Sequence, residues 1–301
     1  MPLWLKVIVY PIVGLLFLVF FSLLLFPFDS LKDRGIQELQ HSLGDGYDIQ
    51  IKSVSYRPLT TVLLKGVKIA LKTDEKQAVK FEKVKLHFSP AALFNKEVAL
   101  DFDLKDEKSH VEGSFLNNAE VLKIDSSLEH FDLAIVRFLL DRWKIPIEGI
   151  LSGTIALEWY WDNPLRNMGQ MSLQWETLQL GAMQIPGAID LPAMALVSEG
   201  KGDSKIDLKI NRANWTVEDL ELHGTDLDLT LNGKVYGAKQ LDNYRFNLRG
   251  DFKLAPELIQ KLPLLAVIDA QKTAEGVYPL TVTGRLSKPN IRIGEFKVPL
   301  F

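Results

Sequence analysis

Apolar and polar residues alternate along several stretches of this 301-residue chain. In residues 244–254, aromatic or aliphatic side chains occupy every second position except Gly250, and polar or charged residues separate them. A period of two recurs in residues 98–104, 155–161 and 226–231. Successive side chains of a strand point to opposite faces, so this pattern predicts an antiparallel sheet with one apolar and one solvated face. The chain is therefore predicted to be mainly β.

Three segments have helical rather than strand-like spacing. Residues 29–43 and 131–143 carry apolar side chains three or four positions apart, and residues 255–270 begin with Pro256, a favoured residue in a first helical turn. Pro263 is expected to kink or split the last of these helices. No flexible linker separates the strand-rich regions, so residues 45–301 are predicted to form one β domain with two short helices.

Residues 7–28 form an uncharged apolar run between Lys6 and Asp29. At about 1.5 Å per residue, a helix of this length reaches roughly 33 Å, enough to cross a bilayer core. The run is longer than the apolar core of a signal peptide, and no Ala-x-Ala pattern follows it. We therefore expect an uncleaved anchor in residues 1–28 with a cytoplasmic tail, and a juxtamembrane helix in residues 29–44.

An apolar-x-Gly-x-apolar pattern recurs within the predicted strands. It is centred on Gly113, Gly153, Gly233, Gly250 and Gly284. Glycine weakens a strand interior, so its repeated use predicts bends, bulges or close approach of neighbouring backbones, as a curved sheet requires. The alternative is that these are ordinary strand glycines.

The composition and the motifs argue against several classes of function. The formal net charge of -3 does not indicate a nucleic-acid partner, and the absence of cysteine excludes disulfides and thiolate metal sites. The five histidines have no metal-ligand spacing, and Asp101 and Asp103 alternate with apolar residues as a solvated strand face would. No nucleophile or phosphate-binding motif is present. We therefore predict no catalytic residue, no metal and no cofactor, and a protein that is not an enzyme.

The apolar face of the sheet is the better candidate for function. It must be covered, either by a second sheet in a sandwich or by acyl chains held in a trough. The predicted lining residues of such a groove are Trp159, Trp161, Leu227, Leu229, Phe246, Leu248 and Phe252. The alternative is that these residues form a dry core.

Three elements of the sequence resemble those of AsmA-like envelope proteins. Residues 81–100 resemble a strand–P-x-x-L-x-x-x-x-V–strand element, residues 217–235 a paired-strand element, and residues 279–291 a closing P-L-x-x-x-G-x-L-x-x-P element. With its single N-terminal anchor and its length, the chain is most similar to the type II secretion system protein N (GspN) family, which is related to AsmA-like proteins.

This resemblance implies a single-pass inner-membrane protein with most of its chain in the periplasm. It implies a curved AsmA-like groove or sandwich, a binding or scaffolding role in type II protein secretion, and partners among the secretion-system subunits. The alternative function that it implies is lipid binding or lipid transfer through an apolar β groove, with phospholipid as the partner. An outer-membrane-directed adhesin or enzyme fits the sequence least.

Overall fold

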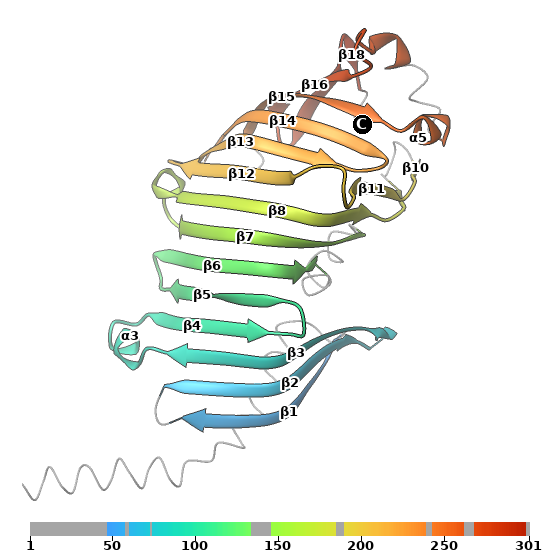
Figure 1. Cartoon of the computed structure of the whole chain (residues 1–301). Helices are drawn as coiled ribbons and strands as arrows, with labels where there is room; N and C mark the ends of the chain where they lie inside the picture. Colours follow the sequence, from blue (N-terminus) through green and yellow to red (C-terminus); the bar gives the residue numbers. More distant parts are fainter. Residues whose placement is uncertain are drawn as a thin grey trace, which may run out of the picture. The chain divides into compact units, whose positions relative to one another are not determined.

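The computed structural model describes residues 47–57, 60–72, 74–133, 146–184, 190–238, 243–261 and 268–298, and it is mainly β (Figure 1). The chain divides into two compact units, within residues 1–90 and 91–301. The predicted anchor, the predicted helix at 29–43 and most of the predicted helix at 131–143 lie outside the described residues. Among the residues described, no helix has both the length and the apolar character to span a membrane.

The first unit contains an antiparallel meander of three strands. These are β1 (Tyr47–Arg57), β2 (Thr61–Leu71) and β3 (Asp74–Phe88). Val67 of β2 pairs with Ile51 of β1 and Phe81 of β3, and Val67 and Phe81 are buried. The alternation in each strand therefore puts its apolar side chains on one shared face.

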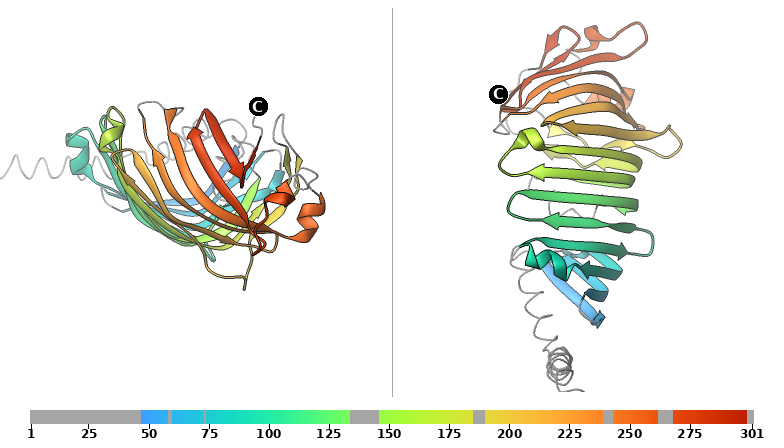
Figure 2. Two further views of the ribbon diagram at one scale, coloured as in Figure 1. Left: turned by 90° about the horizontal axis from the view of Figure 1, so that it is seen from above. Right: turned by 90° about the vertical axis from the view of Figure 1, so that its left-hand side faces the viewer.

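The second unit is built on a long antiparallel sheet in which consecutive strands are neighbours, apart from an excursion after β8. Its order is β4 (Val98–Lys105), β5 (His110–Asn117), β6 (Val121–Asp132), β7 (Ile147–Tyr160), β8 (Met168–Leu180), β12 (Ser204–Asn211), β13 (Asn214–His223), β14 (Leu227–Tyr236), β15 (Arg245–Leu254), β16 (Tyr278–Arg285), β17 (Lys288–Ile293) and β18 (Phe296–Lys297). Figure 2 shows that these strands bend in the same sense. The antiparallel sheet predicted from the alternation is present, and its curvature is one of the outcomes that the strand glycines predicted.

The excursion between β8 and β12 contains three short strands. Strands β9 (Met183–Gln184) and β10 (Asp190–Leu191) pair with each other, and β11 (Met194–Val197) pairs with β8. Strand β11 also packs beside β13 and β14. In the described part of the second unit, there is no second large sheet of the kind that a sandwich would need.

Two short α-helices are described. Helix α5 (Pro256–Lys261) begins with the proline that predicted it, and the 3₁₀ turn η4 (Asp269–Gln271) follows after the undescribed residues 262–267. Helix α3 (Pro90–Phe94) was not expected, because it is only five residues long and has no helical repeat to detect. A second 3₁₀ turn, η2 (Pro164–Arg166), connects β7 to β8.

The glycines of the recurring pattern lie where neighbouring strands approach closely. Gly153 has φ of +145°, and a Cβ built on it would collide with the carbonyl oxygen of Ser172 on β8. A Cβ at Gly250 would collide in the same way with the carbonyl oxygen of Thr230 on β14. These close approaches of the backbones are one of the outcomes that the strand glycines predicted.

Candidate apolar binding face

One face of the second unit is apolar along nearly the whole sheet. Residues paired across neighbouring strands point to the same face, and the registers trace one row from β4 to β17. This row is Phe102, Gly113, Ser126, Ile155, Met171, Leu208, Val217, Gly233, Leu248, Val282 and Ile291. We call the face that carries this row the apolar face.

Bulges keep the apolar face continuous at two places where the alternation of apolar and polar residues shifts by one position. On β13, Val217 pairs with Gly233 and Leu220 pairs with Leu231, so two residues of β13 lie opposite one of β14 and β13 holds one extra residue. A similar shift between β7 and β8 occurs beside Leu151, which pairs with Trp175. Such bulges bend a strand and increase its twist while returning the apolar side chains to the same face.

The middle of the apolar face is covered. We call Leu128, Leu151, Leu173, Leu178, Leu222 and Val197 the covered stretch; each is at most 8% exposed. Val197 belongs to β11, and Leu196 beside it also packs against this cluster. The covered stretch is therefore a buried apolar cluster to which β6, β7, β8 and β13 contribute, together with β11, which pairs with β8 in the same sheet.

The same face has a different character on β4, β5 and the first half of β6. Leu100, Phe102, Phe115 and Ile124 are only partly buried, and Val98 is 46% exposed. We call Leu100, Phe102, Phe115 and Ile124 the half-open stretch. Its side chains shield one another laterally, as neighbours on a sheet do, but none of them is buried.

The predicted lining residues divide between these environments. Trp159 pairs with Leu122 on the apolar face and is partly buried. Leu227, Leu229 and Phe246 are also partly buried on that face.

The remaining three predicted residues differ from this group. Leu248 and Phe252 are each 9% exposed and belong to core clusters, and the ring of Phe252 stacks on Tyr278 with 5.2 Å between centroids. Trp161 lies outside the strand, because β7 ends at Tyr160, and it is 56% exposed in the turn that leads to β8. Its backbone N–H donates to the carbonyl oxygen of Glu120.

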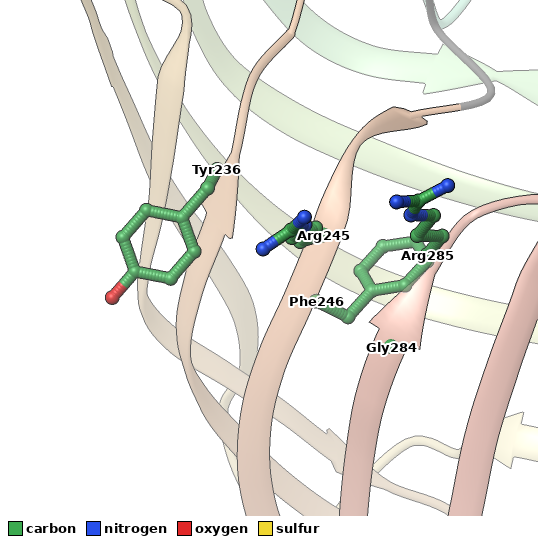
Figure 3. Close-up of a pocket in the computed structure, with 5 residues that line it drawn as sticks. All are labelled: Tyr236, Arg245, Phe246, Gly284 and Arg285. Carbon is green, nitrogen blue, oxygen red and sulfur yellow. The ribbon is translucent and has the colours of Figure 1, made fainter.

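A pocket of about 570 Å³ opens at one end of β14, β15 and β16. Tyr236, Arg245, Phe246, Gly284 and Arg285 line it (Figure 3). Arg245 pairs with Tyr236 on one side and with Arg285 on the other. The pocket therefore joins the apolar face, through Phe246, to a pair of neighbouring arginines at the strand ends.

The opposite face of the sheet carries ion pairs between adjacent strands. Lys123 Nζ lies 2.9 Å from Glu158 Oε1, and this hydrogen bond raises the pKa of the lysine and lowers that of the carboxyl group. Lys205 pairs with Asp219 at 3.0 Å, which raises the pKa of Lys205. These pairs are consistent with the solvated face that the alternation predicted.

Three histidines on this polar face lie beside carboxylates. His110 Nε2 is 3.2 Å from Asp103 Oδ1, His130 Nδ1 is 2.6 Å from Glu176 Oε1, and His223 Nδ1 is 3.0 Å from Asp228 Oδ1. Sequence spacing missed these pairs because each joins residues on different strands. Within the described ranges, no group of three or more such side chains is arranged to hold a metal ion.

No family model, curated protein or solved structure matches the chain.

Proposed function

We propose that this protein binds lipid acyl chains against the half-open stretch of its apolar face and acts without catalysis. The observation that supports the proposal most is the contrast along one continuous face. Each residue of the covered stretch is at most 8% exposed, whereas Leu100, Phe102, Phe115 and Ile124 keep part of their surface exposed.

The energetics favour an apolar occupant. Transferring apolar surface out of water releases about 25 cal/mol per Å², or about 0.8 kcal/mol for each CH₂ group. A row of partly exposed aliphatic and aromatic side chains offers that gain to an acyl chain along its whole length. The ion pairs of the opposite face keep that side of the sheet in water.

The proposed setting is a single-pass inner-membrane protein with its β region in the periplasm. The uncharged run of residues 7–28 supports the anchor. A membrane-tethered sheet with an apolar face would lie next to a supply of phospholipid, which gives the tether a role in the proposed activity.

A second candidate is a scaffolding role in type II protein secretion. It is favoured by the resemblance of residues 81–100, 217–235 and 279–291 to elements of the GspN family. In that role the ion-paired polar face would contact other subunits, and the apolar face would serve only as structure. The two roles are compatible in one protein.

Site-specific photocrosslinking in cells tests lipid binding. A photoreactive amino acid replaces Phe115 on the apolar face, and the matched control places it at Ser114, the neighbouring residue on the polar face. With phospholipids labelled by radioactive phosphate, we expect a labelled adduct at position 115 and none at position 114. Equal labelling at both positions, or labelling at neither, contradicts the proposal.

The secretion role has a separate test. We expect that deleting the gene leaves substrates of the type II system in the periplasm if the scaffolding proposal is correct. A folded Phe115→Asp variant that restores export but co-purifies with no phospholipid would assign export to scaffolding alone. Normal export in the deletion strain would refute the scaffolding role without bearing on lipid binding.

A further inference from the structure

The two long edges of the sheet in the second unit, where strands end and reverse, differ in character. Because the strands are antiparallel, alternate connections meet at the same edge. One edge consists of residues 94–98, 117–121, 161–168, 211–214, 236–238, 243–245 and 285–288. We call it the aromatic rim; it contains the end of α3 and the turn from β7 to β8, on the left in Figure 1.

The aromatic rim collects the exposed apolar side chains of the second unit. Every large hydrophobic residue that is exposed in the described part of residues 91–301 lies on it. They are Phe94 (90%), Leu165 (67%), Trp161 (56%), Met168 (50%), Val98 (46%), Tyr236 (45%) and Leu286 (39%). Scattered exposed hydrophobic residues are common, but their confinement to one edge marks an interaction surface.

The two edges also differ in charge. On the aromatic rim the basic residues Lys96, Arg166, Arg212, Arg245, Arg285 and Lys288 outnumber Glu97, Glu120 and Asp162. On the opposite edge, acidic residues such as Glu107, Glu199, Asp203, Glu257, Glu275 and Glu295 outnumber the lysines. The exposed apolar side chains are therefore found where the charge is positive.

The turn from β7 to β8 is held in place locally. The side-chain oxygen of Asn163 accepts a hydrogen bond from the N–H of Leu165, and the fully buried Asn167 accepts one from the N–H of Tyr160. The guanidinium of Arg166 lies 3.9 Å from the centre of the Tyr160 ring. These contacts fix the backbone that presents Trp161 and Leu165 to solvent.

The pocket of Figure 3 supplies a second feature of the same rim. Arg245 and Arg285 are direct cross-strand neighbours, an arrangement in which like charges repel. In the described part of the chain, neither arginine forms an ion pair or a hydrogen bond through its side chain. An anionic group beside them would relieve the repulsion.

We propose that the aromatic rim binds the surface of an anionic phospholipid membrane. Tryptophan and tyrosine favour the level of the headgroups, and basic side chains near an anionic surface contribute about 1 kcal/mol each. The apolar tips of Leu165 and Met168 would enter the boundary between headgroups and acyl chains. This inference does not depend on acyl chains occupying the half-open stretch.

The absence of cysteine allows a direct test on the full chain. A Leu165→Cys variant carries an environment-sensitive fluorophore on the aromatic rim, and an Ala274→Cys variant carries it on the opposite edge, where Ala274 is exposed. Each full-length protein is held by its anchor in a phosphatidylcholine nanodisc. Vesicles of phosphatidylcholine, with or without phosphatidylglycerol, are then added.

We expect vesicles that contain phosphatidylglycerol to shift the emission of the label at position 165 to the blue, and salt to reverse the shift. The label at position 274 should not respond. In flotation with the same vesicles, an R166Q/R245Q/R285Q variant with unchanged melting temperature should bind about a hundredfold more weakly, because it lacks three of the basic side chains.

Three results would overturn the proposal. One is an equal response of both labels. A second is an equal response to vesicles with and without phosphatidylglycerol. The third is no response to either vesicle, which would indicate that the aromatic rim binds a protein and not a membrane.

Discussion

The covered and half-open stretches carry the same kind of side chain on the same face of one sheet, yet only the side chains of the covered stretch are buried. Leu173 and Leu178 on β8 are 8% and 3% exposed, and they belong to a buried cluster that includes Val197 of β11, the short strand that pairs with β8. Leu100 and Phe115 on β4 and β5 have apolar neighbours beside them but are not buried. An apolar pattern therefore predicts which face avoids water, whereas the burial of its individual side chains decides whether a part of that face serves as core or as a binding surface.

The largest expected effect is a matched pair of leucine truncations. Leu178→Ala should reduce the free energy of unfolding by about 3 kcal/mol, because it opens a cavity in the covered stretch. Leu100→Ala should cost about 1 kcal/mol, since a partly exposed side chain loses less burial. Urea unfolding of the two variants measures both values; equal losses would break the distinction between the stretches.

Alanine substitutions at two glycines test whether strands β7 and β8 pack closely beneath the covered stretch. Gly153→Ala should cost about 2 kcal/mol or more, because the new Cβ collides with Ser172 at a positive φ. Gly200→Ala also has a positive φ, +74°, but no atom within 4 Å of the new Cβ, so its cost should be about 1 kcal/mol. A Gly153→Ala variant no less stable than Gly200→Ala would show that the strands can move apart there.

Tyr278 tests a polar group inside the core formed with Phe252. Its hydroxyl donates a hydrogen bond to Asp269 Oδ1 at 3.0 Å, and only 1% of the residue is exposed. Tyr278→Phe should cost about 1 kcal/mol, whereas Tyr236→Phe at the exposed strand end should cost almost nothing. Thermal unfolding measures both, and equal effects would show that the bond does not stabilise the core.

Tyr278 also predicts a pH dependence in the alkaline range. The pKa of the phenol is raised above its usual value of 10.0, mainly by burial and to a smaller extent by the hydrogen bond to Asp269. The folded state therefore favours the protonated phenol, and this stabilisation is complete below the unfolded pKa. It should fall as the pH rises through the folded pKa, and Tyr278→Phe should remove that part of the alkaline decline.

The smallest expected effect lies on the polar face, at the pair of Lys123 and Glu158. The hydrogen bond from Lys123 lowers the pKa of Glu158, so the pair stabilises the folded state above the unfolded pKa of about 4.5. That contribution should be lost as the pH falls through the lower, folded pKa. Both side chains are more than a third exposed, so Glu158→Gln should cost about 0.5 kcal/mol or less at neutral pH.

The pH profile checks this last prediction. Below pH 4, the wild type and the Glu158→Gln variant should approach the same stability, because the carboxyl group becomes protonated. A difference that does not change with pH would mean that the pair contributes by packing alone.

Alternation was sufficient to predict the main strands and the apolar face, because sheet geometry ties every second residue to one side. It placed Trp159, Leu229 and Phe246 on one face, but it extended β7 to Trp161. The Asp162-Asn163-Pro164 turn ends that strand at Tyr160. The alternation of apolar and polar residues does not show where a strand ends, because it can continue into the turn.

The covered stretch could not be anticipated in the same way. Two residues that contribute to it, Leu196 and Val197, belong to a four-residue strand whose position depends on pairing with β8 and packing beside β13. The aromatic rim was missed for a related reason. Its members are far apart in sequence and meet only because antiparallel connections return to the same edge.

Lipid analysis of residues 45–301, expressed in the periplasm and purified without detergent, tests the central claim most directly. Native mass spectrometry should find phospholipid bound to the folded wild type in a near-stoichiometric amount. A folded Phe115→Asp variant should carry none, because its charge faces the half-open stretch. A folded wild type free of lipid, or one that keeps its lipid after Phe115→Asp, would contradict acyl-chain binding at the half-open stretch.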